Sequence, residues 1–415
     1  MGNKLLRNIN EIKRQKDTYL TPNNLKTNVE LLGVGGTFTN DATATSNDLL
    51  KPEVAYVNGQ KIEGTIQASY ETTLPEQYNR QISYSVTLND ADLEYNIGIY
   101  CSATTLCRIY RLNETTINSS YISVSNSSFS TSITFYANVA TLSHEPTVIN
   151  GVTYLRAYVA AKNSSSKVGI ASFLINVETL ACSNFLFRQV ASASWNNGCT
   201  SSNNPSILNV PTTNDRCCIA YFAIGSADAW THYQIMKFTA TSSSTTFLIN
   251  SGNNTSNTAQ GLSDFRWNFS PNGKTLGCFS NMTRMWGNPH YWTTIIKFSD
   301  DYNSFDVLKN TVDNTKPLSK YSLLINDELF ANGTSMYDID AVSTRVAYLP
   351  FTPAATCNGM QLGKYYFYVS STSATTMYMY TVEDTTLTSA TSTSIKANQV
   401  FYHPRKRYCF CYRKQ

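Results

Sequence analysis

Apolar and polar residues alternate in a recurring way from about residue 81 to the end of the chain. Each recurrence is an alternating apolar stretch followed by a polar turn, the pattern typical of a half-buried β-strand. Five segments carry it, at 107–112, 173–177, 235–238, 295–298 and 379–382. Their last apolar residues are separated by 65 (112 to 177), 61 (177 to 238), 60 (238 to 298) and 84 (298 to 382) positions. This spacing predicts a degenerate repeat of roughly 60 residues.

A repeat that carries strand after strand predicts an all-β fold, and we expect a β-propeller of about six blades, with five or seven as alternatives. One blade hairpin is clear around Pro271 and Gly273, where proline sets φ for the corner and glycine accepts an unusual φ. The chain ends in a similar hairpin, which would leave an open strand edge. We expect residues 82–88 to complete this last blade by pairing with residues 400–412. A β-sandwich or two stacked β-domains are the competing architectures.

The first 70 residues have a different pattern. Leu5, Ile9 and Ile12 recur with helical spacing, which predicts a short amphipathic helix over residues 4–17. Further on, residues 54–66 predict a β-hairpin that turns at Asn58-Gly59, the pair that most readily supplies two positive φ angles. A hairpin of this size is not stable alone, so we expect it to pack on another copy or on another protein.

These patterns divide the chain into three parts. Residues 1–70 form an arm made of the short helix and two hairpin units. Residues 71–81, which include Pro75, form a linker. Residues 82–415 form the propeller-like domain, because the alternating strands begin there and continue to the end.

The composition favours strands, and it argues against nucleic-acid binding and against a zinc site. Charged residues make up only 14% of the chain, and there are 27 Tyr, a mixture that suits strands and polar loops better than helices. The net charge of +4 is small, and much of it lies near the C-terminus, so we expect no nucleic-acid binding. None of the ten Cys residues has Cys-x-x-Cys spacing, which argues against a zinc site.

The N-terminus does not resemble a signal peptide, and no apolar run is long enough to span a membrane. Leu6 also occupies the position where a myristoylation signal requires Ser or Thr. We therefore expect synthesis in a reducing cytoplasm, no membrane insertion, and cysteines that are mostly free, buried thiols.

Two clusters of aromatic residues and histidine are the candidate ligand site. Both lie just before the third strand of neighbouring predicted blades, and loops between second and third strands share the propeller face where ligands usually bind. Trp and Tyr can stack on sugar rings through their apolar faces, while His can bind hydroxyls. The competing interpretation is that these side chains pin the loop to the strand behind it. The candidates are Trp230, His232, Tyr233, Trp286, His290, Tyr291 and Trp292.

Catalysis finds little support in the sequence. Asp300-Asp301 and the pair Asp338 and Asp340 are paired acids in principle, but their places beside strands favour turn capping. The turn at 270–273 lacks the Asp and Trp of sialidase-type repeats, and no phosphate loop or nucleophile motif is present. We predict that the chain is not an enzyme and needs no cofactor or metal.

Two segments of the first 70 residues resemble a linked pair found in bacteriophage virion appendages. The second reads Leu-Leu-Lys-Pro-Glu-Val-Ala-Tyr-Val-Asn-Gly-Gln-Lys-Ile-Glu-Gly-Thr-Ile from position 49, and the first contains Pro-Asn-Asn-Leu-Lys followed by Leu-Leu-Gly-Val-Gly-Gly-Thr-Phe. Both end in Gly-Thr and a large apolar residue. The resemblance implies a phage structural protein without specifying the appendage. It assigns the attachment arm to Tyr56, Asn58, Gly59, Gly64 and Thr65.

The resemblance implies a non-enzymatic phage structural protein, a tail fibre, head fibre, knob or decoration. Its arm would anchor it to other virion proteins, and its propeller would contact a glycan or protein of the host surface. We expect a homo-oligomer, with a trimer favoured, located in the virion after synthesis in the bacterial cytoplasm. The alternative is a propeller-type enzyme of the virion that degrades polysaccharide.

Overall fold

The structure is a computed structural model of the full chain, which forms two compact units, Met1–Thr72 and Thr73–Gln415. The helix expected at 4–17 lies outside the residues that the structure describes. These residues are 22, 25, 30–31, 34–35, 45, 54–57, 60–63, 80–84, 87–112, 121–190, 205–224, 229–239, 243–251, 259–284, 290–313, 322–351, 358–362, 365–369, 376–383, 386–394, 399–403 and 408–414.

Two small hairpins make up most of the described part of the first unit. The antiparallel pairs are β1 (Glu30–Leu31) with β2 (Val34–Gly35), and β3 (Val54–Val57) with β4 (Gln60–Glu63). Leu31 lies opposite Val34 and Val57 opposite Gln60, so each connection has two residues. The hairpin around Asn58-Gly59 therefore has the register that its turn residues predict.

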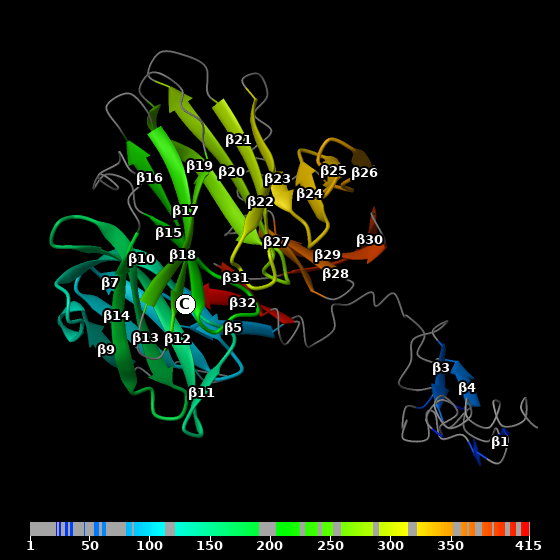
Figure 1. Ribbon diagram of the computed structural model, residues 1–415, viewed down its shortest axis with the longest axis horizontal. Helices are drawn as coiled ribbons and strands as arrows, with labels where there is room; N and C mark the ends of the chain where they lie inside the picture. The colour runs from blue at the N-terminus through cyan, green and yellow to red at the C-terminus, as the bar shows by residue number, and fades with distance from the viewer. Residues whose placement is uncertain are drawn as a thin grey trace, which may run out of the picture. The chain divides into compact units, whose positions relative to one another are not determined.

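The second unit is a succession of antiparallel sheets, each made of strands that follow one another along the chain (Figure 1). The first sheet contains β6 (Asp90–Asp92), β7 (Ile97–Ala103), β8 (Leu106–Arg111) and β9 (Tyr121–Ser125). The second contains β10 (Ile133–Leu142), β12 (Val152–Asn163), β13 (Val168–Asn176) and β14 (Cys182–Gln189), with β11 (Thr147–Ile149) added beside β12. The third contains β15 (Ser206–Asn209), β16 (Arg216–Ile224), β17 (Ala229–Phe238) and β18 (Ser243–Ser251).

Three more sheets of the same form follow. The fourth contains β19 (Ala259–Phe269), β20 (Thr275–Arg284), β21 (His290–Phe298) and β22 (Phe305–Asp313). The fifth contains β23 (Ser322–Leu324), β24 (Leu329–Asn332), β25 (Ser335–Asp338) and β26 (Arg345–Tyr348). The sixth contains β27 (Asn358–Leu362), β28 (Tyr365–Val369), β29 (Thr376–Glu383) and β30 (Thr386–Ser394). This regular succession of four-stranded meanders is the arrangement typical of propeller blades.

A last, closing sheet joins the two ends of the second unit. β31 (Gln399–His403) pairs with β32 (Tyr408–Lys414), and β32 pairs in parallel with β5 (Arg80–Tyr84); Figure 1 shows the red strands beside the blue one. In a four-stranded meander the fourth strand runs in the direction of the second. β5 precedes the first sheet and so holds the place of a fourth strand. Among the described strands of this sheet, β5 lies directly beside the second strand, β32, and runs parallel to it.

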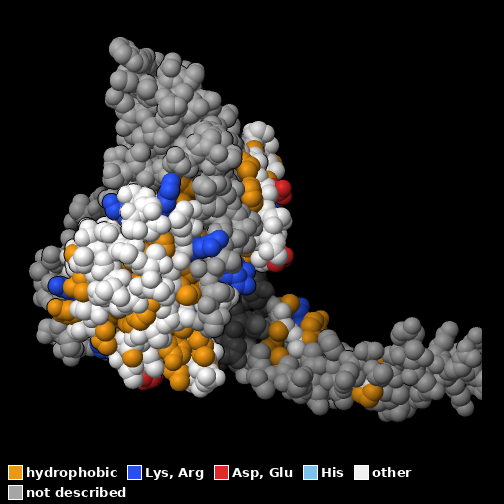
Figure 2. Space-filling model, turned by 60° about the vertical axis from the view of Figure 1, so that its left-hand side comes forward, with side chains coloured by type: hydrophobic (Ala, Val, Ile, Leu, Met, Phe, Trp, Pro, Cys, Tyr) orange, Lys and Arg blue, Asp and Glu red, His pale blue; other side chains and the backbone are white. Residues whose placement is uncertain are grey.

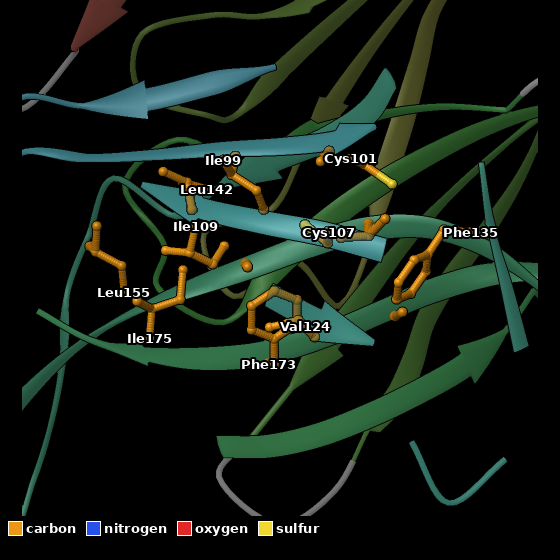
Figure 3. Close-up of a cluster of buried hydrophobic side chains, with 14 of the residues drawn as sticks. Ile99, Cys101, Cys107, Ile109, Val124, Phe135, Leu142, Leu155, Phe173 and Ile175 are labelled. Atoms are coloured by element: carbon orange, nitrogen blue, oxygen red, sulfur yellow. The ribbon is translucent and has the colours of Figure 1, made fainter. Parts of the chain in front are cut away.

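Apolar cores lie between successive sheets. Between the first and second sheets, Ile99, Ile109 and Val124 meet Leu155 and Phe173, all within 2% of complete burial (Figure 3). Similar cores join the second sheet to the third, the third to the fourth, the fourth to the fifth and the fifth to the sixth. A sheet with a neighbour on each face buries both faces of its central strands. This arrangement explains why β13 is buried at eight of its nine positions.

The second unit thus has seven sheets among the described residues, where the sequence pattern indicated about six. The difference lies in the longest gap of the repeat, 298 to 382, which contains the fifth sheet. Its strands have only three or four residues, too few to show a clear alternation. The described residues contain no α-helix. The three-residue 3-10 helix η4 (Asn126–Ser128) follows β9, and no described helix is long and apolar enough to cross a membrane.

The turn at Gly273 links the third and fourth sheets. Gly273 has a φ of +74°, and a Cβ atom added there would lie 2.4 Å from the carbonyl oxygen of Pro211. Tyr302 donates a hydrogen bond to the Gly273 carbonyl oxygen at 3.0 Å, and Thr212 donates to that of Asn272 at 3.1 Å. The glycine is therefore required both by its backbone angle and by the close approach of a neighbouring turn.

We expect Gly273→Ala to lower the free energy of unfolding by about 2–3 kcal/mol, from the left-handed φ and the contact with Pro211 together. Gly151→Ala is the matched control, because Gly151 has a φ of +80° and no atom within 4 Å of an added Cβ. The control should cost only about 1 kcal/mol. Urea denaturation of the two variants measures the difference, and equal losses would contradict the role of the Pro211 contact.

Candidate functional site

The predicted ligand residues lie within strands, which corrects their expected place in loops. Trp230, His232 and Tyr233 belong to β17, which is hydrogen-bonded to β16 on one side and to β18 on the other. His290, Tyr291 and Trp292 begin β21 in the same way, and Trp286 lies outside the described residues. The strands start earlier than their apolar alternation suggests because both neighbours continue the ladder of backbone hydrogen bonds.

Tyr233 belongs to the core and not to a ligand surface. It is 2% exposed and packs in the cluster between the third and fourth sheets, with its ring 6.0 Å from that of Trp267. Its neighbours Ile235 and Cys278 are also buried. For this residue the competing interpretation, an aromatic side chain that holds the strand in place, is the one that the structure supports.

The third strands of the third and fourth sheets carry Trp and His at matching positions. Both strands have an irregularity at the same point of their pairing with the fourth strand, at Ile235/Met236 and Ile295/Ile296. When the strands are aligned on this irregularity, Trp230 corresponds to His290, and His232 corresponds to Trp292. Each strand therefore has one Trp and one His at positions two residues apart, near the end where the second strand passes to the third.

The large exposed apolar side chains in the described part of the second unit are spread over several sheets. Figure 2 shows hydrophobic, polar and basic side chains interspersed over the visible face. The large apolar residues with high exposure lie on five different sheets. Two of them, Tyr348 and Tyr378, are at positions near the end of their sheets where the second strand passes to the third, as Trp230 and Trp292 are. These exposed apolar residues of the second unit are Tyr121, Val148, Val307, Tyr348 and Tyr378.

Of the residues predicted for the attachment arm, the structure describes Tyr56, which is 52% exposed on β3. The others, Asn58, Gly59, Gly64 and Thr65, lie outside the described residues.

A buried charge cluster joins the first and second sheets. His144 follows β10, and its ring lies between two carboxylates of β6: Nδ1 is 3.4 Å from Asp92 Oδ2, and Nε2 is 3.6 Å from Asp90 Oδ2. The side chain of Asp92 is 0% exposed, and those of Asp90 and His144 are 11% and 14% exposed. We name these three residues the His144 cluster.

Both carboxylates also accept hydrogen bonds from other groups. Asp90 accepts from the Thr141 hydroxyl at 2.7 Å and from the backbone N–H groups of Ala91 and Leu142. Asp92 accepts from the backbone N–H groups that follow it, at Glu94 and Tyr95. These donors favour the ionised carboxylates, which in turn favour the charged imidazole.

The charges of the cluster are fixed at neutral pH. Burial by itself would lower the pKa of His144, but the charges and hydrogen bonds of Asp90 and Asp92 outweigh it and raise that pKa to about 10. Burial would raise the pKa of Asp90, but His144 and the other donors hold it below its usual value. A histidine that stays protonated is a poor general base, so this arrangement suits a structural ion pair between sheets.

We expect the cluster to make stability depend on pH above neutrality. The folded pKa of His144 is raised above its usual value of 6.5 to about 10, so its contribution is complete below about pH 6.5 and is lost as pH rises toward 10. Urea denaturation at about pH 6 and about pH 9 should show wild type losing more stability over this interval than His144→Gln. Parallel losses in the two proteins would contradict this assignment.

The acid pairs noted in the sequence serve as turn caps and ion pairs. Asp301 accepts from the Ser299 hydroxyl and the Asn303 backbone N–H, and Asp338 accepts from the backbone N–H groups of Asp340 and Ala341. Asp340 also pairs with Lys297 Nζ at 2.6 Å across the fourth and fifth sheets. No group of three or more His, Cys, Asp or Glu side chains in the described part of the chain is arranged to hold a metal.

Comparison with known proteins gives structural similarity only. No family model matches the chain, and no curated protein matches it. Among solved structures, an α-L-arabinofuranosidase of Fusarium graminearum is similar at 11% identity and a TM-score of 0.37, over 72% of this chain and 77% of the enzyme. A putative 6-phosphogluconolactonase of Bacteroides fragilis is 8% identical (TM-score 0.30, 81% and 90% covered), and the β-propeller domain of Nup133 of Vanderwaltozyma polyspora is 13% identical (TM-score 0.28, 83% and 94% covered).

Proposed function

We propose that this chain is a non-enzymatic bacteriophage virion protein, a fibre, knob or decoration of the particle. Its N-terminal unit attaches it to other virion proteins and to copies of itself, and its second unit contacts the host surface. The observation that carries the proposal is the separate N-terminal unit. Its two hairpins, each with a two-residue connection, fall in the two segments that resemble phage appendage proteins.

We also propose that the second unit is a seven-bladed propeller closed by β5. Two kinds of contact support a ring. The first strands of neighbouring sheets touch, as β6 does β10, β10 does β15 and β19 does β23, and β31 of the closing sheet touches β6 of the first. The closing sheet itself combines strands from both ends of the unit. A ring closed in this way leaves no unpaired sheet end to associate with other chains.

The aromatic strand ends are the proposed host-contact surface. The matched Trp and His positions of β17 and β21 lie where second strands pass to third strands, and residues of these types bind sugars by stacking and by hydrogen bonds to hydroxyls. The acid pairs of the described residues, by contrast, are engaged: Asp90 and Asp92 with His144, and Asp340 with Lys297. This engagement favours binding over hydrolysis.

The oligomeric mass of the full chain, compared with that of residues 73–415, tests the role of the arm. We expect the full chain to be a homo-oligomer, a trimer by preference, and the shorter chain to be a monomer with an unchanged melting temperature. Light scattering coupled to size exclusion gives both masses. If both chains are monomers, the proposed self-association of the arm is wrong. If both are oligomers, the interface between copies lies on the second unit.

Release of reducing ends from bacterial surface polysaccharide by the purified full chain tests the non-enzymatic part of the proposal. We expect none above the buffer control. Measurable release would replace the binding function with the polysaccharide-degrading one. Trp230→Ala and Trp292→Ala would then show whether the same strand ends serve the reaction.

A further inference from the structure

Cys101 and Cys107 lie directly opposite each other on β7 and β8. Among the strand pairings that the structure describes, this register alone brings two cysteines face to face. Both side chains are 0% exposed within the core between the first and second sheets (Figure 3). The chain returns from one to the other through the short turn between β7 and β8, so the two residues are neighbours in sequence as well as in the sheet.

The hydrogen bonds around Cys101 show whether Cys101 and Cys107 form a hydrogen-bonded or a non-hydrogen-bonded pair of the antiparallel ladder. The backbone N–H of Cys101 donates to Asn89 Oδ1 at 2.8 Å, and the carbonyl of Ile99, two residues earlier on the same strand side, accepts from the backbone N–H of Asn89. The backbone groups of Cys101 therefore point away from β8, as in a non-hydrogen-bonded pair. The Cα atoms of such a pair are about 4.5 Å apart, within the range of about 4.4–6.8 Å that a disulfide spans.

The thiols also differ in acidity. Their mutual hydrogen bond lowers the pKa of Cys101, although burial opposes the change. Burial, with the hydrogen bond to Cys101, raises the pKa of Cys107. Cys101 is thus the thiol that more easily becomes the attacking thiolate, and Cys107 remains protonated beside it.

We propose that Cys101 and Cys107 form a reversible dithiol–disulfide couple that exchanges with small-molecule disulfides such as glutathione disulfide. The Cys101 thiolate attacks one sulfur of the small disulfide, forms a mixed disulfide and releases one thiolate. Cys107 then gives up its proton and attacks the Cys101 sulfur, which releases the second small thiol. The protein loses two electrons and two protons, and the small disulfide becomes two thiols.

The couple is independent of the proposed virion function, because it rests only on the pairing of β7 with β8. Exchange requires local opening of this hairpin or takes place while the chain folds, since both sulfurs are buried. Cys182, on β14 of the second sheet, is the competing partner, because its sulfur is near enough to Cys107 to raise that pKa. It lies on a strand that pairs with neither β7 nor β8.

Refolding in a glutathione redox buffer, followed by alkylation and tryptic mapping without reduction, tests the proposal. One tryptic peptide, residues 81–108, contains both cysteines, so the proposed bond appears as an internal loss of two hydrogen atoms and protects both from alkylation. A bond to Cys182 would instead join this peptide to residues 168–188. Running the same buffer in concentrated urea gives the reference for the unfolded chain and removes the limit that burial sets on access.

We expect the closed peptide to be at least tenfold more favoured in the native buffer than in urea, because the sheet holds the two residues opposite each other. Cys182→Ala should retain this preference, and Cys107→Ala should abolish the closed peptide. By linkage, a tenfold preference corresponds to about 1.4 kcal/mol of added stability in the oxidised protein. An equal or smaller yield in native buffer, or a dominant bond to Cys182, would overturn the proposal.

Discussion

Replacing Asp92 with alanine is expected to lower the free energy of unfolding by about 3–5 kcal/mol, the loss typical of breaking a buried ion pair. The side chain of Asp92 is 0% exposed and faces the ring of His144 at 3.4 Å. Its removal leaves the protonated histidine buried with one carboxylate in place of two. The backbone N–H groups of Glu94 and Tyr95 also lose their acceptor.

Two further variants separate the charge from the geometry. Asp92→Asn keeps an oxygen acceptor for Glu94 and Tyr95 but removes the negative charge, so its loss should be intermediate. Asp340→Ala is the exposed control, since Asp340 pairs with Lys297 at 2.6 Å but is 68% exposed, and it should cost at most about 1 kcal/mol. Urea denaturation at neutral pH compares all three. A loss for Asp92→Ala no larger than that of the control would show that the cluster is not an important ion pair.

The second large effect is expected from removing β5. A chain that begins at residue 87 lacks this strand, and its closing sheet has only the β31–β32 hairpin, which is marginal as an isolated two-stranded sheet. The lost ladder with β32, which runs from Arg80 to Tyr84, is expected to cost on the order of 3–5 kcal/mol at about 1 kcal/mol for each hydrogen bond. A clear fall in melting temperature and a gain in aggregation should follow.

The matched control for this deletion is the chain of residues 73–415, which keeps β5 and lacks only the N-terminal unit. Circular dichroism melting and light scattering on the two chains isolate the strand from the arm. Equal melting temperatures and equal solubility would show that the pairing of β5 with β32 contributes little to the fold.

Much of the fold could be predicted from local patterns. The turn at Pro271 and Gly273 depends on a backbone angle that few residue types adopt, so its sequence determines the turn. The pair Asn58-Gly59 predicts a two-residue hairpin connection, which is the register that β3 and β4 have. The longer strands can be predicted from the sequence because a strand that lies between two cores is apolar over most of its length. The fifth sheet could not be predicted because its strands are short. β25, for example, has one buried residue, Met336, among its four residues, which is too little for an apolar alternation to be recognised.

The site was harder to predict than the fold. The His144 cluster joins residues 52 positions apart, and nothing local marks Asp90 or Asp92 as partners of a histidine that follows another strand. The prediction that Tyr233 contacts a ligand is wrong, also because the deciding contact joins residues far apart in the sequence. Aromatic residues at a strand end look alike in sequence whether they face a ligand or a neighbouring sheet, and only the packing of Trp267 against Tyr233 decides.

The parallel pairing of β5 with β32 also has a consequence for the order in which the protein folds. Arg80 pairs with Phe410, 330 positions (80 to 410) later in the chain. In the first six sheets, each strand pairs with a strand that is the next or the next but one along the chain. Contacts between distant residues form late, because the loop between them must be closed first. During synthesis the six meanders can assemble one after another, while β5 cannot pair with β32 until that strand leaves the ribosome. Translation that stops before β32 would then release a chain in which the first six sheets can form but β5 has no partner strand.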